Sequence, residues 1–164
     1  MKNILITGAN GQLGNEMRIL SAENSEYTYF FTDVAELDIC NEQAVQDFVK
    51  ANNIHVIVNC AAYTPVDNAE ENVELCTKLN ADAVGYLANA AEANGAEFIQ
   101  ISTDYVFDGT AHIPYQETEP TCQNTNPLAP AVVVAVTKTS LAISPTKNSP
   151  ASAVPSDLLA YSTS

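Results

Sequence analysis

The sequence predicts an α/β fold: a truncated parallel sheet with flanking helices, followed by an irregular tail. The first observation is that short β-rich apolar runs alternate with helix-period segments along residues 1–119. The second is that a glycine-rich loop joins the first such run to the first such segment. The third is a length of 164 residues with 46% hydrophobic residues, which suits one compact domain with its own core.

The alternation begins with a strand, a helix and a second strand. Lys2 to Thr7 is short and apolar, as expected of a buried strand. Gln12 to Leu20 has the spacing of a helix, and Tyr27 to Thr32 is rich in aromatic residues and threonine, which favour strands. These three segments predict one strand–helix–strand unit.

Two more helices and two more strands complete the pattern. Asn41 can cap a helix, and His55 to Cys60 has the apolar centre of a parallel strand covered on both faces. Glu70 to Asn94 is predicted as a long helix that ends at a left-handed Gly95, with Glu97 to Ser102 as the last strand. The apolar faces expected on the two helices consist of Ala44, Val45, Phe48 and Val49, and of Leu75, Leu79, Ala83 and Leu87.

Charge and composition exclude several classes of partner. Twenty acidic residues against six basic ones give a net charge of −14, so nucleic acid and anionic membranes are not expected to bind. The sequence has no recognisable signal peptide and no apolar run near the roughly 20 residues that span a bilayer, so a cytoplasmic location is expected. Cys40, Cys60, Cys76 and Cys122 form no Cys-x-x-Cys pair and are expected to be buried or half-buried free thiols rather than metal ligands.

The composition changes near Pro120, which predicts a boundary between residues 1–121 and 122–164. Six of the eight prolines lie from Pro120 onward, and charged residues become rare there. Residues 122–164 are therefore expected to form a Pro/Ala/Ser/Thr-rich tail without a long helix. We hypothesise that a shifted reading frame or a divergent splice produced this tail, which the other two frames of the coding DNA would test. The alternative is an ending that evolved as such.

The glycine loop is the first chemical signal. Thr7-Gly8-Ala9-Asn10-Gly11-Gln12-Leu13-Gly14 has glycines at every third position. Gly8 permits a tight turn, Gly11 lets the backbone approach a pyrophosphate, and Gly14 lets the helix pack against the sheet. The loop predicts a Rossmann-like dinucleotide-binding fold, although a plain strand-to-helix turn stays open as an alternative. Asp33 is placed to bind the adenosine ribose, which favours NAD over NADP, unless it is a solvated strand-end residue.

Candidate ligand-binding residues also follow the third and fourth predicted strands. Ligands of open α/β sheets bind at the carboxyl ends of the strands. A hydroxyl at Thr103 is suited to a substrate carbonyl, and Asp104 and Tyr105 are suited to polar substrate groups. The small residues Ala61 and Ala62 would let a flat cofactor approach the backbone. Ordinary turns after strands remain the alternative reading of both segments.

Three segments together resemble the dTDP-4-dehydrorhamnose reductase family of extended short-chain dehydrogenases. They are Ile6–Gly14, Val58–Glu70 and Ser102–Gly109, and the resemblance runs to about Cys122. It implies that NADH or NADPH reduces the 4-keto group of a dTDP-linked deoxysugar on the way to dTDP-L-rhamnose for surface polysaccharide.

The resemblance also implies roles for individual residues, position by position. Thr103 matches the hydroxyl member of the family's Thr–Tyr–Lys catalytic set. The glycine loop, with Gly8, Asn10, Gly11, Gln12, Leu13 and Gly14, would bind the cofactor, and Asn10, Gly11 and Gln12 would lie along its pyrophosphate. Asp33, Asp38 and Ile39 would lie near the adenosine; Ala61, Ala62 and Tyr63 would lie near the inner ribose and the nicotinamide; and Val66, Thr103, Asp104 and Tyr105 would face the sugar nucleotide.

The Tyr-x-x-x-Lys pair of that family is absent here. No tyrosine has a lysine four residues later, and seating Lys138 in the lysine position puts Val134 where the proton donor belongs. Loss of a general acid typically costs about 10²- to 10⁴-fold in rate. The sequence therefore predicts a weak or inactive reductase, or alternatively a non-catalytic NAD(P)-binding or regulatory subunit. The sequence is also compatible with a homodimer.

Overall fold

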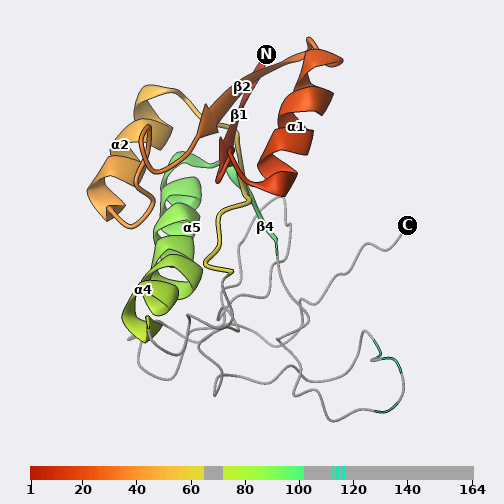
Figure 1. Cartoon of the computed structure of the whole chain (residues 1–164). Coiled ribbons are helices and arrows are strands. Elements are labelled where there is room, and N and C mark those ends of the chain that lie inside the picture. The colour runs from red at the N-terminus through yellow and green to blue at the C-terminus, as the bar shows by residue number, and fades with distance from the viewer. Residues whose placement is uncertain (65–71, 102–111, 113, 115, 117–164) are drawn as a thin grey trace.

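The computed structural model describes residues 1–64, 72–101, 112, 114 and 116. Within this part, all strands belong to one sheet with the order β2-β1-β3-β4 (Figure 1). The predicted tail over residues 122–164, the start of the predicted helix at Glu70 and the end of the last predicted strand at Ser102 lie outside the described residues.

Every neighbouring pair of strands in this sheet is parallel, as the sequence predicts. The chain leaves β1 on one side to form β2 and returns on the other side to form β3. The carboxyl ends of β1 and β3 are therefore the topological switch point, where open α/β sheets bind their ligands. The strands are β1 (Lys2–Thr7), β2 (Tyr27–Thr32), β3 (Val56–Asn59) and β4 (Glu97–Gln100).

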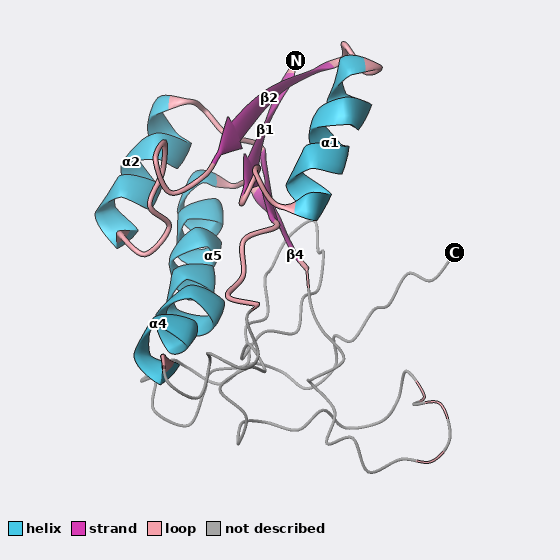
Figure 2. Cartoon of the chain, viewed as in Figure 1, coloured by secondary structure: helices cyan, strands magenta, loops and turns pink. Residues whose placement is uncertain are grey.

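Helices cover both faces of the sheet. Figure 2 shows α1 on one face and α2 and α5 on the other. The helical elements are α1 (Gln12–Ala22), α2 (Glu42–Ala51), α4 (Val73–Thr77), a π-helical turn (Lys78–Asp82) and α5 (Ala83–Asn94). Within the described ranges, none of these helices is both long and apolar enough to cross a membrane.

The larger core cluster lies between the sheet and the helices α2 and α5. Its fully buried members include Leu5, Ile57 and Leu87. The predicted start of α2 is confirmed, because Asn41 Oδ1 accepts a hydrogen bond from the Ala44 N–H at 3.1 Å. The predicted end of α5 is confirmed by Gly95, which has φ +65°. On the opposite face of the sheet, Ile6, Val56 and Val58 are buried together with half-buried Met17, Tyr29 and Phe31.

The long helix predicted up to Asn94 differs from the observed one in two ways. The π-helical turn interrupts it, and its predicted buried face is wrong at Leu75, which is 46% exposed. α4 extends beyond the carboxyl ends of the strands (Figure 1), so the sheet does not cover this part of the helix. Cys76 and Asn80 are the buried residues of this part instead.

Candidate functional site

Two segments meet at the carboxyl ends of β1 and β3. The first is the glycine loop, residues 7–14, and the second is the β3 exit segment, residues 60–64. Gly8 has φ +63°, and a Cβ atom there would lie 2.6 Å from both the Cα and the N of Ala61. The two backbones are thus in direct contact. Only glycine combines this left-handed conformation with this approach.

The three glycines of the loop differ in what the fold demands of them. A Cβ at Gly14 would lie 2.5 Å from the Cα of Ala9 and from the carbonyl oxygen of Gly8, so α1 packs directly onto the turn. The Gly11 N–H donates to the Gly8 carbonyl at 3.0 Å. A Cβ at Gly11 would meet only that carbonyl, at 3.3 Å. Gly8 occupies a tight turn, as predicted. Gly14 was predicted to let α1 pack against the sheet, but the close contact there is with the backbone of Gly8 and Ala9 in the turn itself. Packing against the protein makes no comparable demand at Gly11.

The amino-terminal end of α1 lacks the usual compensation for its backbone dipoles. Gly11 is the N-cap and supplies no side-chain hydrogen bond, and the first turn contains no acidic residue. The N–H groups of such an end favour an anion, because the helix dipole places partial positive charge there. The neighbouring Asn10, Gln12 and Leu13 are exposed.

The end of β2 is joined to the glycine loop by hydrogen bonds. Asp33 Oδ2 accepts from the Asn10 N–H at 3.0 Å, and Asp33 Oδ1 accepts from the Val34 N–H at 2.9 Å. The Ala9 N–H donates to the Thr32 carbonyl at 3.0 Å. The structure therefore brings Asp33 and Asn10 together, and each carboxylate oxygen retains a lone pair for a further donor.

The pair Asp38–Ile39 divides between surface and core. Ile39 is only 5% exposed and belongs to the larger core cluster, so its side chain is not available to a ligand. Asp38 is exposed, and its Oδ1 accepts from the Cys40 N–H at 2.9 Å. It lines a surface hollow of about 590 Å³, which is otherwise lined by Cys40, Asn41, Glu42, Gln43, Gln46 and Lys78.

A row of buried polar side chains lies beneath the β3 exit segment. Thr7, Asn59 and Gln100 are the last residues of β1, β3 and β4 and are aligned in register. The Thr7 hydroxyl donates to Asn59 Oδ1, and Asn59 Nδ2 donates to Gln100 Oε1 at 2.7 Å. Asn59 Oδ1 also accepts from the Ala61 N–H at 3.1 Å. The row thus connects three strand ends and holds the start of the exit segment.

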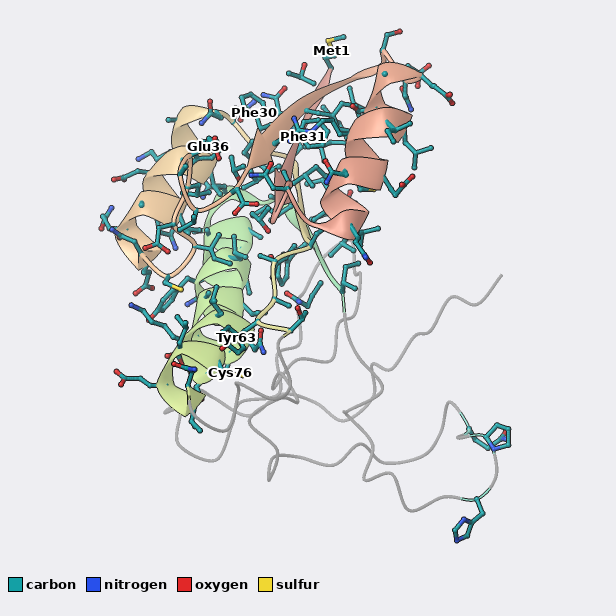
Figure 3. The ribbon with its side chains drawn as sticks, in the orientation of Figure 1. Met1, Phe30, Phe31, Glu36, Tyr63 and Cys76 are labelled. Atoms are coloured by element: carbon teal, nitrogen blue, oxygen red, sulfur yellow. The ribbon has the colours of Figure 1, made fainter. Side chains whose placement is uncertain are left out.

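A second buried asparagine holds the exit segment at Tyr63. The Tyr63 N–H donates to Asn80 Oδ1 at 2.7 Å, and Asn80 Nδ2 donates to the Tyr63 carbonyl at 3.1 Å. Figure 3 shows Tyr63 beside the part of the helix that carries Cys76. Neither Asn80 nor the roles of Thr7, Asn59 and Gln100 were predicted from the sequence. The signal that could have found them is an amide or hydroxyl at a position where the pattern demands an apolar side chain.

The cysteines of the described part are buried to different degrees. Cys76 is buried, and Cys40 and Cys60 are half-buried, as predicted. Burial raises the pKa of all three thiols, with the Asp38 carboxylate raising that of Cys40 further and the Asn80 hydrogen bond opposing the effect at Cys76. Across residues 1–64 and 72–101, no three His, Cys, Asp or Glu side chains gather closely enough to hold a metal ion.

The residues predicted to contact the sugar nucleotide cannot be placed against this site. Val66, Thr103, Asp104 and Tyr105 lie outside the described residues. The described residues therefore include only the part of the site that was predicted to contact the cofactor. In this part Gly8 contacts Ala61, and hydrogen bonds join Asn10 to Asp33 and Tyr63 to Asn80.

The parallel sheet, its helices on both faces and the glycine loop define a Rossmann-like α/β domain. The family model described as the RmlD substrate binding domain matches residues 1–129, and the chain belongs to this family. The dTDP-4-dehydrorhamnose reductases of Aggregatibacter actinomycetemcomitans and Burkholderia thailandensis are 42% and 43% identical to it over 119 residues. These matches cover 73% of this chain and 40% and 39% of the relatives. The chain thus spans about two fifths of their length.

Solved structures agree with this assignment. A dTDP-4-dehydrorhamnose reductase from Clostridium acetobutylicum superposes with a TM-score of 0.72 at 44% identity, over 77% of this chain and 44% of the other. The enzyme of the same name from Bacillus anthracis, solved in complex with NADP, gives a TM-score of 0.70 at 40% identity, over 78% of this chain and 45% of the other. The family resemblance seen in the sequence is confirmed.

Proposed function

We propose that this chain carries the NADH- or NADPH-binding part of a dTDP-4-dehydrorhamnose reductase. The observation that carries the proposal is the contact of Gly8 with Ala61, because it places the uncapped amino-terminal end of α1 next to the β3 exit segment at the switch point of the sheet. Relatives of this name match the same part of the chain, and one of them was solved with NADP.

The described residues fit such a dinucleotide. The pyrophosphate would lie along Asn10, Gly11 and Gln12, because the first turn of α1 has no side-chain cap and a ligand can approach Gly11 closely. The N–H groups of Asn10 and Gly11 themselves are bound to Asp33 and to the Gly8 carbonyl, so the anion would be held by the N–H groups that follow them. Asp33 would accept hydrogen bonds from the adenosine ribose, with Asp38 and the backbone of Ile39 nearby. When bound, the cofactor would supply the hydride for reduction of a 4-keto sugar.

On the other side of the site, Ala61, Ala62 and Tyr63 would face the nicotinamide. Ala61 and Ala62 carry only methyl side chains, and Ala62 is exposed, so a flat ring can approach their backbone. The sugar nucleotide would contact Val66, Thr103, Asp104 and Tyr105, as the family resemblance implies. Thr103 would then hydrogen-bond the reacting carbonyl. The substrate would be dTDP-4-dehydro-L-rhamnose, and a cytoplasmic location stays a prediction of the sequence.

A second candidate is a non-catalytic NAD(P)-binding or regulatory subunit. It is favoured by the absence of Tyr-x-x-x-Lys: no tyrosine of the chain has a lysine four residues later, where the family's lysine would lower the pKa of the proton-donating tyrosine. Both candidates bind the dinucleotide, but only the first reduces a sugar nucleotide.

Isothermal titration of the 164-residue chain with NADH and with NADPH tests what the two candidates share. We expect binding in the wild-type chain and at least about ten-fold weaker binding in Gly11→Ala, whose new methyl group would occupy the pyrophosphate approach. The control for folding is the thermal midpoint, which should change little because Gly11 has φ −74° and meets only one atom closely. Absence of binding in the wild-type chain would contradict the proposal.

Oxidation of NADH in the presence of dTDP-4-dehydro-L-rhamnose separates the candidates. We expect weak turnover at most, because Tyr-x-x-x-Lys is absent. Binding without any turnover would favour the non-catalytic subunit. Robust turnover would instead establish a working reductase and refute the non-catalytic reading.

A further inference from the structure

The β3 exit segment has no regular secondary structure, yet its backbone is fixed at two points by buried side chains. Asn59 Oδ1 accepts from the Ala61 N–H at 3.1 Å, and Asn80 binds both the N–H and the carbonyl of Tyr63, at 2.7 and 3.1 Å. Between these points lies Ala62, which is exposed. Two long-range contacts therefore decide where this part of the backbone runs.

Asn80 is in an unusual helical environment. It is 4% exposed and lies in the π-helical turn Lys78–Asp82, between α4 and α5. An amide this deeply buried costs free energy unless its hydrogen-bonding groups are used, and both of them are used here. A π-helical turn is also less stable than a continuous α-helix and often marks a functional site. Helix stability alone therefore does not explain this residue.

We propose that Asn80 is a positioning residue for the nicotinamide half of the cofactor, acting through the backbone of Tyr63. The role rests on the proposed function, since it assumes that the exit segment faces the cofactor. Asn80 itself does not contact the ligand. It holds the Tyr63 peptide groups, and thereby keeps Ala62 and Ala61 at a fixed distance from the glycine loop, whose Gly8 contacts Ala61.

This arrangement predicts a division of labour between the two halves of the dinucleotide. The adenosine and pyrophosphate half would be bound by the glycine loop and Asp33, which are fixed by bonds that do not involve Asn80. Loss of Asn80 should thus weaken binding of the whole dinucleotide but not of ADP, which contains only that half.

The test compares NADH and ADP in calorimetric titrations of the whole chain and its variants. In Asn80→Ala we expect NADH binding to weaken about ten-fold, as the loss of two hydrogen bonds suggests, while ADP binding changes less than about two-fold. Asn80→Asp keeps the acceptor for the Tyr63 N–H but loses the donor for the Tyr63 carbonyl. Its NADH affinity should therefore lie between that of the wild-type chain and that of Asn80→Ala. Asn89→Ala is the matched control, because Asn89 is an exposed asparagine of α5.

Amide hydrogen exchange of the free chain provides a second readout that does not depend on any ligand. Asn80→Ala should accelerate exchange of the Tyr63 amide about ten-fold or more, while the Ala61 amide, which Asn59 holds, serves as an internal reference. A general loss of stability would accelerate both amides together.

The outcomes distinguish this role from the proposed function. An NADH-to-ADP affinity ratio that is the same in Asn80→Ala as in the wild-type chain would overturn the role of Asn80 and leave the proposed function standing. Unchanged exchange at Tyr63 would also overturn the role. If the wild-type chain binds no NADH, the proposed function falls and the role falls with it.

Discussion

The glycine loop and the β3 exit segment touch each other at Gly8 and Ala61, but different forces hold them in place. The glycine loop is shaped by its own backbone, through a left-handed Gly8 and the close packing of Gly14 on Ala9. The exit segment depends on side chains that are distant in sequence, since Asn80 lies 17 residues after the Tyr63 that it binds. One segment is built by steric necessity and the other by buried hydrogen bonds.

This difference predicts how each segment responds to amino-acid substitution. A glycine that is required for space tolerates no side chain at all, because a Cβ atom would overlap backbone that cannot move independently. A buried amide tolerates a change of size better, but it leaves unpaired polar groups behind when it is removed. Substitutions in the two segments should therefore differ in the size of their effect and in how they fail.

The largest effect is expected from Gly8→Ala. The substitution combines the cost of a left-handed alanine with the overlap at Ala61, and should lower the free energy of unfolding by about 4 kcal/mol. Urea unfolding measures this loss. Gly95→Ala is the matched control, because Gly95 has nearly the same φ but no atom within 4 Å of its missing Cβ. It should cost only about 1 kcal/mol, and an equal loss in both variants would show that the contact with Ala61 is unimportant.

A smaller but still large effect is expected from Asn59→Ala. The change leaves the Ala61 N–H and the partner atoms of Thr7 and Gln100 without their hydrogen bonds, and should cost about 3 kcal/mol. The control is Asn41→Ala, which removes a single helix-capping bond and should cost about 1 kcal/mol. Urea unfolding of the two variants side by side would reveal whether the polar row contributes more than one cap.

Asp33→Asn should have a modest effect on stability and a clearer one on ligand selectivity. The asparagine retains one acceptor for the two N–H groups that Asp33 binds, so the loss should be about 1 kcal/mol or less. Removing the negative charge should improve NADPH binding relative to NADH, because the 2′-phosphate is no longer repelled. Titration with both cofactors measures the ratio. An unchanged ratio would place Asp33 away from the adenosine ribose.

The smallest effect concerns Cys60, which begins the exit segment. Burial raises the pKa of its thiol, so less thiolate is present at pH 8 than in an unfolded chain. Iodoacetamide should therefore modify Cys60 several-fold more slowly in the native chain than in urea, as peptide mass spectrometry can follow. The raised pKa stabilises the folded chain below the usual thiol pKa of about 8.5, and this contribution is lost as the pH rises further. Equal alkylation rates would show that the segment is open to solvent.

Much of the fold was predictable because its signals are local. Strand β1 and strand β2 have the predicted bounds, since an apolar or aromatic run between turn residues is read directly from the chain. The same is true of the Asn41 cap and the Gly95 stop. The exposure of Leu75 was not predictable, because periodicity describes a helix face but not how far the sheet extends beneath it.

The residues of the candidate site likewise fall into those with a local signal in the sequence and those without one. The glycine loop and Asp33 were found from spacing alone, and the structure brings Asp33 to the Asn10 N–H. Asn59 lay within a segment selected for its small residues, but its function as the centre of a buried polar row depends on partners in other strands, 52 and 41 residues away along the chain. Asn80 carried no local signal except that it is polar on the helix face that buries Cys76 and Leu87.

The sequence by itself determined the order of strands and helices, the glycine loop and the membership of the family, because each rests on residue types at short, fixed spacings. It also determined that the Tyr-x-x-x-Lys pair is missing. Only the tertiary structure decided how the β3 exit segment is held, since Asn59 and Asn80 act through hydrogen bonds that exist only once distant strands and a π-helical turn are brought together.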